Sequence, residues 1–142
     1  MPSEPLFRQR FNVGGGDFVN AGKASITMKG ILKEIGIQPS VIRRVAIASY
    51  EAEMNVVLYA RKGTMELQVT PADIRIRVAD EGQGIPDVEL AMQEGYSTAS
   101  DEIREMGFGA GMGLPNIKKN ADVFAINSVV GKGTTLEITI RL

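Results

Sequence analysis

The sequence predicts an α+β fold, a two-layer sandwich in which one mixed β-sheet carries helices on one face. Two observations predict it. Apolar residues in the first part of the chain recur three or four residues apart, as in amphipathic helices, whereas from residue 65 onward they mostly alternate with polar residues, as in strands. The segments follow the order strand, two helices, hairpin, loop, helix, hairpin, which favours helices packed on one sheet.

The first part of the chain is expected to hold one strand and two helices. Residues 6–13 form the extended segment. Asp17 is predicted to cap a helix that ends near Gly36, because aspartate is a favoured N-cap residue. Ser40 is the next N-cap candidate, and a second helix is expected to run from it to about Ala60. The apolar stripe of this second helix consists of Val41, Val45, Ala48, Ala52, Val56 and Tyr59.

The rest of the chain is expected to form two hairpins separated by a glycine-rich loop and a helix. Residues 65–69 and 74–78 alternate in polarity around a Pro71-Ala72-Asp73 turn. The loop covers residues 82–113, with a short helical piece at 88–93. Pro115 suits the first residue of a further helix to about Asn120. The remaining strands are expected at 124–129 and 136–140, joined by a Gly131-Lys132-Gly133 turn.

Length and composition limit the classes of protein that fit. The chain has 142 residues, which suits one domain covering 1–142. Its formal net charge of -1 gives no argument for nucleic acid or an anionic membrane as a partner. With no cysteine and no histidine, thiolate and imidazole chemistry are excluded, and so is a phosphohistidine within the chain. We find no membrane span in the sequence and expect a cytoplasmic location.

Two polar residues border the apolar stripe of the second predicted helix. Glu51 and Asn55 are four residues apart, so they are neighbours on one helix face. They lie beside the stripe, where they would border a pocket. Two solvated polar residues at the edge of a buried helix explain the same pattern.

A carboxylate followed by two glycines comes directly after the strand that ends near residue 79. Asp80 at a strand end can accept a hydrogen bond from an exocyclic amine, and Gly82 and Gly84 let the backbone turn so that a flat ring can approach. An ordinary glycine-containing loop is the alternative interpretation.

Four glycines at alternate positions precede the helix that begins near Pro115. The segment Gly107-Phe-Gly-Ala-Gly-Met-Gly113 leaves backbone N–H groups uncovered by side chains, next to the positive end of a helix dipole. This arrangement favours a phosphate cradle over a flexible loop without a ligand. It lacks the ending of a P-loop and the preceding strand of a dinucleotide-binding fold. Gly131-Lys-Gly-Thr134 serves as a hairpin turn, whether or not it also contacts a ligand.

Together, the order and spacing of these motifs resemble the GHKL superfamily of gyrase, Hsp90 chaperones, histidine kinases and MutL proteins. Glu51-x-x-x-Asn55 is similar to the N box of that superfamily, and Asp80-x-Gly82-x-Gly84 to its first glycine box. Gly109-x-Gly111-x-Gly113 is similar to the second glycine box, and Gly131-x-Gly133-Thr134 to the last strand motif. The resemblance covers nearly the whole chain and implies a Bergerat-type fold that binds ATP through Mg²⁺.

Within the superfamily, the chain looks most like the single-domain anti-sigma-factor and stress-module switch kinases. Histidine kinases commonly carry a lysine three residues beyond the N-box asparagine, where this chain has Leu58. The resemblance implies phosphorylation of a serine or threonine on a small STAS-type antagonist, by a monomer or homodimer. Some such proteins also hold a sigma factor or a phosphatase.

The resemblance also implies a role for each site residue. Glu51 is expected to be the general base, Asn55 the Mg²⁺ ligand and Asp80 the acceptor for the adenine amine. The remaining nucleotide contacts are expected from Gly82, Gly84, Gly107, Gly109, Gly111, Met112, Gly113, Leu114 and Thr134. Residues 87–108 are expected to form a lid over the nucleotide. A nucleotide-gated binding module and a slow ATPase use the same residues and remain the alternatives.

Overall fold

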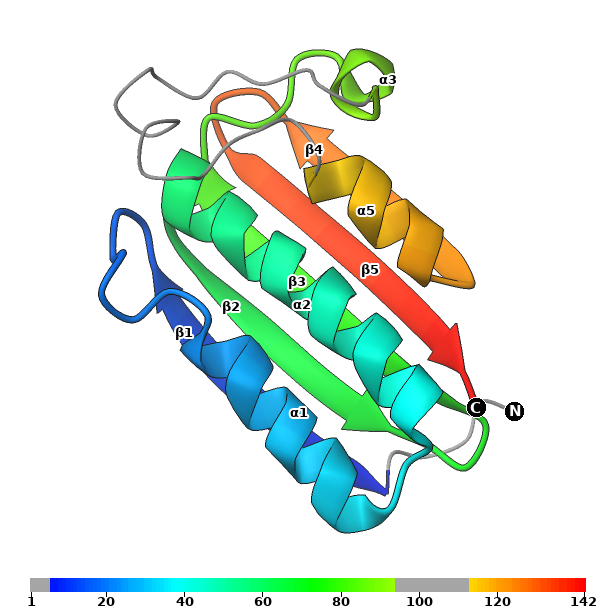
Figure 1. Cartoon of the computed structure of the whole chain (residues 1–142). Coiled ribbons are helices and arrows are strands. Elements are labelled where there is room, and N and C mark those ends of the chain that lie inside the picture. The colour runs from blue at the N-terminus through cyan, green and yellow to red at the C-terminus, as the bar shows by residue number, and fades with distance from the viewer. Residues whose placement is uncertain (1–5, 94–112) are drawn as a thin grey trace.

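A computed structural model of the chain describes residues 6–93 and 113–142 (Figure 1). Most of the expected lid at 87–108 lies outside these residues. The predicted site residues Gly107, Gly109, Gly111 and Met112 lie wholly outside them. In chain order the described elements are β1 (Phe7–Gly14), α1 (Lys23–Ile35), α2 (Pro39–Tyr59), β2 (Ala60–Val69), β3 (Asp73–Gly82), α3 (Val88–Ala91), α5 (Gly113–Asn120), β4 (Val123–Val129) and β5 (Gly133–Arg141).

The strands form a five-stranded sheet in the order β1-β2-β3-β5-β4. The predicted α+β class and two-layer arrangement are confirmed, but all four pairings between the described strands are antiparallel, so this sheet is not mixed. The connections explain the difference. Two antiparallel helices, α1 and α2, separate β1 from β2, so the chain re-enters the sheet in the opposite direction. The helix α5 leads from β3 to β4, but β5 lies between these two strands and is antiparallel to both.

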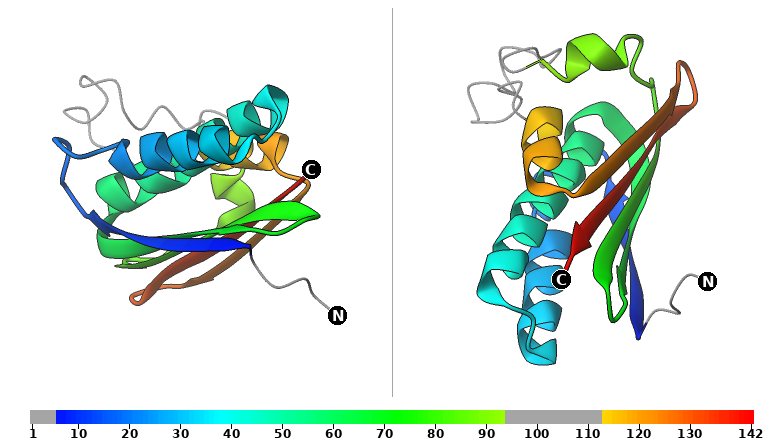
Figure 2. Two further views of the ribbon diagram at one scale, coloured as in Figure 1. Left: turned by 90° about the horizontal axis from the view of Figure 1, so that it is seen from below. Right: turned by 90° about the vertical axis from the view of Figure 1, so that its right-hand side faces the viewer.

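The helices α1, α2 and α5 cover one face of the sheet and leave the other face open, as the two views in Figure 2 show. The central helix α2 lies between α1, on the β1 side, and α5, on the β4 side (Figure 1). Alternate strand residues point into the layer between sheet and helices. The core there includes the fully or almost fully buried side chains of Met28, Leu32, Val45, Val56, Met65, Leu67, Ile74, Ile76, Ile117, Ile138 and Ile140.

The open face of the sheet carries charged side chains in cross-strand rows. Arg10 on β1 is opposite Glu66 on β2, with Arg10 Nη2 3.1 Å from Glu66 Oε2. Glu66 is in turn opposite Arg77 on β3, and Arg77 is opposite Glu137 on β5, at 3.8 Å between Nε and Oε1. Alternating charges stabilise neighbouring strands and keep this face in water.

The start of α1 differs from the prediction. The helix begins at Lys23 and not directly after Asp17, whose carboxylate binds the backbone and side chain of Asn20 in the preceding loop. The N-cap position is Gly22, which has no side chain to serve as a cap. The cap comes instead from the buried carboxylate of Glu53 on α2, which accepts hydrogen bonds from the backbone of Gly22, Ala24 and Ser25.

Three strand boundaries extend beyond the prediction: β2 begins at Ala60, β3 ends at Gly82 and β5 begins at Gly133, because backbone pairing continues past the apolar alternation. Most of the remaining boundaries agree with the prediction. The helix α1 ends at the predicted Gly36, which is in the left-handed conformation. The helix α2 begins one residue before the predicted cap Ser40, because Pro39 occupies its first turn, where a missing N–H costs nothing. Among the described helices, none is long and apolar enough to cross a membrane.

Candidate functional site

The predicted base and metal ligand lie together on one face of α2. Glu51 and Asn55 are both half-buried, one helical turn apart, and face the start of α5. A Cβ atom on Gly113 would lie 3.3 Å from Asn55 Oδ1 and 3.5 Å from Glu51 Oε2. A glycine at this position therefore lets the N-terminus of α5 approach the two polar side chains closely.

The surroundings of Glu51 act on its carboxyl group in opposite directions. Burial raises its pKa above the ordinary value, because the charged form loses hydration, whereas a hydrogen bond with the Asn116 side chain lowers it. Asn116 is half-buried on α5, one turn after Gly113. No motif in the sequence pointed to Asn116. Its signal was a polar residue between the buried Pro115 and Ile117.

A second group of polar side chains lies where the apolar core ends on β3 and β5. Asp80 continues the inward-facing series that includes Val78, and Thr134 continues the series that includes Leu136. The backbone N–H of Thr134 donates to Asp80 Oδ1 at 3.0 Å, so Oδ2 is the oxygen that can accept a further donor. Burial raises the pKa of Asp80, and the Thr134 hydrogen bond partly opposes this rise.

The predicted first glycine box packs directly against the β4–β5 turn. The N–H of Gly82 donates to Lys132 O at 3.1 Å, and the N–H of Gly131 donates to Gln83 O at 2.8 Å. A Cβ on Gly84 would lie 2.5 Å from Val129 O, and one on Gly133 would lie 2.0 Å from Asp80 O. Gly84 and Gly133 are therefore required by backbone packing, whatever their part in binding a nucleotide.

The second glycine box is described only from Gly113 onward. Gly113 and Leu114 are the first two residues of α5, and the Leu114 side chain is buried in the core. The predicted residues Gly107, Gly109, Gly111 and Met112 lie outside the described residues. What the structure does place is the N-terminus of α5, next to Glu51 and Asn55, where a helix dipole favours an anion.

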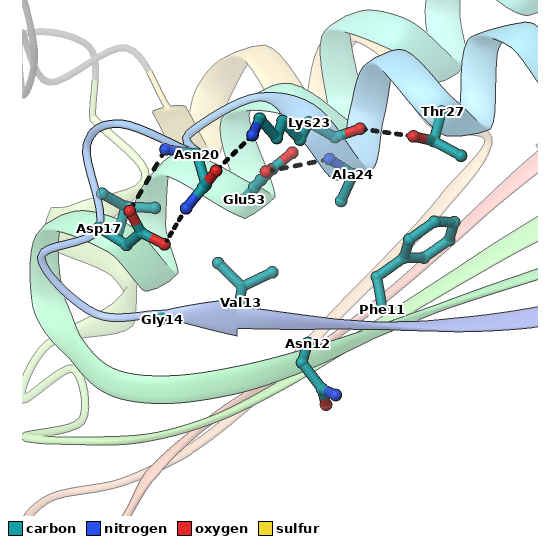
Figure 3. Close-up of a pocket in the computed structure, with 11 residues that line it drawn as sticks. Phe11, Asn12, Val13, Gly14, Asp17, Asn20, Lys23, Ala24, Thr27 and Glu53 are labelled. Carbon is teal, nitrogen blue, oxygen red and sulfur yellow. Dashed lines mark hydrogen bonds between the residues drawn. The ribbon is translucent and has the colours of Figure 1, made fainter.

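A pocket of about 320 Å³ lies on the other side of α2, between β1 and the start of α1 (Figure 3). Its walls include Phe11 and Val13 from β1, and Asp17, Asn20 and Lys23 around its mouth. These three polar residues bind one another, and Glu53 is engaged by the α1 backbone. None of the predicted site residues that the structure describes lines this pocket, and we assign it no ligand.

The fold and these polar groups together indicate the class of protein to which the chain belongs. The antiparallel sheet with helices on one face, a carboxylate–carboxamide pair facing a helix N-terminus, and an aspartate at a strand end together describe a histidine kinase-like ATPase fold. The model of the histidine kinase-like ATPase domain family matches residues 20–140, and the chain belongs to this family.

Two relatives within this family have known names, and the chain is similar to each over most of its length. The chain is 34% identical over 114 residues to the serine/threonine-protein kinase RsbT of Bacillus subtilis, covering 77% of this chain and 79% of the relative. It is also 34% identical over 103 residues to the anti-sigma F factor of Caldanaerobacter subterraneus, covering 69% and 68% of the two chains.

Two solved structures share the fold. The SiaB–SiaC complex from Pseudomonas aeruginosa contains a chain that matches with a TM-score of 0.67 and 15% identity, covering 97% of this chain and 90% of that one. The RsbU and RsbW domains of a Mycobacterium tuberculosis protein match with a TM-score of 0.63 and 18% identity, covering 94% of this chain and 32% of that one. At such low identities these likenesses concern the fold alone.

Proposed function

We propose that the protein is an ATP-dependent serine/threonine kinase that acts as a regulatory switch on a small STAS-type antagonist protein. The observation that carries the proposal is the half-buried pair Glu51 and Asn55 facing the N-terminus of α5. A carboxylate there can accept a proton, next to a carboxamide oxygen and a helix end that attract a metal and phosphates. The 34% identity to a protein named a serine/threonine kinase supports the choice of reaction.

The described residues fit ATP and Mg²⁺. Asp80 Oδ2 offers an acceptor for the adenine amine, because Oδ1 is already held by Thr134. Asn55 offers a neutral oxygen ligand, which suits a hard cation, and the positive dipole end of α5 favours phosphate. When bound, Mg²⁺ supplies neutralisation of phosphate charge. We place the reaction in the cytoplasm, where ATP is available.

In the proposed transfer, the hydroxyl oxygen of a partner serine or threonine forms a bond to the γ-phosphorus while the bond from this phosphorus to ADP breaks. Glu51 accepts the proton of the hydroxyl. Burial raises the pKa of Glu51, which makes it a stronger base than an exposed glutamate, and Asn116 orients the carboxylate by a hydrogen bond. Phosphoryl transfer needs mainly positioning and charge neutralisation, so one base and this set of ligands suffice.

The proposal is tested by radiolabelled γ-phosphate transfer to a STAS-type partner protein, with ATP affinity measured on the same samples. Glu51→Gln keeps the shape and removes the base, so we expect transfer to fall about 10²- to 10⁴-fold while ATP affinity is nearly unchanged. Asn55→Ala is expected to reduce both. Glu34→Gln, which changes an exposed carboxylate on α1, serves as the matched control.

Three results would contradict the proposal. A wild-type transfer rate in Glu51→Gln would mean that Glu51 is not the base. Partner binding that depends on ATP without any labelling of the partner would support a nucleotide-gated binding module in place of a kinase. Phosphate release without labelling would support a slow ATPase. Some members of the switch-kinase group that the sequence resembles also bind a sigma factor or a phosphatase. A pull-down experiment with the same variants would reveal such a partner of this protein.

A further inference from the structure

The polar group formed by Asp80 and Thr134 has a third member that no sequence motif indicated. Ser128 on β4 is directly opposite Thr134 on β5, in the same register. Ser128 follows Ile126 on the inward-facing side of β4, just as Asp80 follows Val78 on β3. Asp80, Thr134 and Ser128 therefore form one polar row across β3, β5 and β4, directly beyond the last apolar row of the core.

Hydrogen bonds join the members of this row. The N–H of Thr134 donates to Asp80 Oδ1 at 3.0 Å, and the hydroxyl oxygens of Ser128 and Thr134 are 2.8 Å apart. Ser128 Oγ also accepts the backbone N–H of Ile85 at 2.7 Å, which ties the row to the loop that follows the first glycine box. Thr134 is 8% exposed, so this network is largely shielded from competing water.

The distance between the two hydroxyl oxygens is compatible with either one as the donor, so the other contacts of Ser128 bear on the direction. Ser128 has one proton, which can go to Thr134 Oγ1 at 2.8 Å or to Gly133 O at 3.4 Å. Ser128 Oγ already accepts the Ile85 N–H at 2.7 Å, and a hydroxyl that accepts a hydrogen bond becomes a better donor, which favours Ser128 as the donor to Thr134. When Ser128 donates to Thr134, the proton of Thr134 is released to donate to a ligand.

We propose that Ser128 is a positioning residue that determines base specificity, because it makes Thr134 a donor beside the acceptor Asp80. Adenine presents an amine donor next to the ring acceptor N1, and these two groups match the acceptor Asp80 and the donor Thr134. Hypoxanthine presents an oxygen acceptor next to an N1–H donor, so its oxygen would face the acceptor Asp80 and its N1–H would face the donor Thr134. This inference rests on the proposed use of ATP and adds a residue through which the site distinguishes purine bases.

The test compares two variants of the same shape. Ser128→Thr keeps the hydroxyl, whereas Ser128→Val replaces it with a methyl group, and both β-branched residues suit a strand. Calorimetric titration with ATP and with inosine triphosphate, in the presence of Mg²⁺, gives the ratio of the two affinities. Thr135→Ala is the matched control, because Thr135 is next along β5 and faces the open side of the sheet.

We expect the wild-type protein, Ser128→Thr and Thr135→Ala to prefer ATP, and Ser128→Val to lose about tenfold of that preference. Thermal unfolding checks that each variant is folded, and Ser128→Ala replaces Ser128→Val if the valine variant is not. An unchanged affinity ratio in the folded variant without the hydroxyl overturns the inference, and so does a wild-type protein that binds both nucleotides equally. A wild-type protein that binds neither nucleotide removes the proposed function, and the inference with it.

Discussion

Glu51 and Glu53 are separated by one alanine on α2, yet their side chains meet different surroundings. Glu53 is 2% exposed and accepts four hydrogen bonds from the start of α1, so its oxygens are fully engaged. Glu51 faces α5 and is half-buried, with a hydrogen bond to Asn116. Only Glu51 of these two carboxylates is placed to exchange a proton with a substrate, which is why we assign the chemistry to it.

The hydrogen bond between Asn116 and Glu51 gives a prediction for pH dependence. This bond lowers the pKa of Glu51 against the larger effect of burial, so Asn116→Ala is expected to raise that pKa further. The base must be unprotonated, and the rate therefore falls as pH drops through the pKa. The acidic limb of the transfer rate against pH is expected to move to higher pH in Asn116→Ala.

The measurement is single-turnover phosphate transfer across a pH series, with ATP saturating at every pH. Asn127→Ala removes an exposed asparagine from β4 and is expected to leave the limb in its wild-type place. If Asn116→Ala and the wild-type protein share the same acidic limb, the Asn116 hydrogen bond has no influence on the reacting base.

Sequence reasoning found the residues that belong to ordered motifs and missed those that act through tertiary contacts. Glu51 with Asn55, and Asp80 with Thr134, follow from spacing along one element or from a turn pattern, and the structure brings each pair together. Asn116, Ser128 and Glu53 differ, because each depends on a partner in another element. Ser128 left a signal in the sequence, a polar residue at the end of an inward-facing alternation, and Asn116 left another, a polar residue between the buried Pro115 and Ile117.

At the scale of elements, the start of α1 shows how a tertiary contact replaces a local one. Asp17 is the residue type that caps helices, but the helix starts six residues later, at Lys23. The reason is that α2 supplies a carboxylate from Glu53, which binds the first backbone N–H groups more completely than one local side chain could. The cap also fixes α1 against α2, on the side away from the candidate site.

This cap predicts a large loss of stability from a small change. In Glu53→Gln, one acceptor oxygen becomes an NH₂ group that faces backbone donors, so buried N–H groups lose their partner. We expect the free energy of unfolding to fall by about 1.5 to 3 kcal/mol, as for other hydrogen bonds to charged groups. Urea unfolding followed by circular dichroism measures it.

The control for this prediction is Glu34→Gln, an exposed carboxylate on α1 itself, for which we expect a change within about 0.5 kcal/mol. A similarly small change in Glu53→Gln would mean that α1 gains little from the cap.

The helices and strands themselves were predicted well, because their apolar periodicity is set by burial against one core. The antiparallel direction of every pairing was not, because strand order is fixed by packing between distant segments.

At the scale of the whole molecule, the polar groups lie where the sandwich ends and the apolar rows stop. The predicted base on α2 and the polar row on β3, β5 and β4 are held by elements that also form the core. Rigid elements position the groups, but burying carboxylates without a paired cation costs stability. Function and folding therefore make opposite demands on Glu51 and Asp80, whose pKa values are both raised by burial.

These raised pKa values give a prediction for the stability of the protein without nucleotide. A carboxyl whose pKa is higher in the folded state binds its proton more tightly there, so its contribution to stability is full at low pH and is lost as pH rises through the folded-state pKa. At neutral pH the two carboxylates therefore destabilise the fold. We expect Glu51→Gln and Asp80→Asn each to raise the free energy of unfolding at pH 7 by roughly 0.5 kcal/mol, a modest value because both side chains remain partly hydrated. The gain should shrink as pH falls toward the ordinary range of carboxyl groups, whereas Glu34→Gln should show no such trend. Urea unfolding at several pH values measures both effects, and a loss of stability at pH 7 in both variants would show that the two carboxylates support the fold.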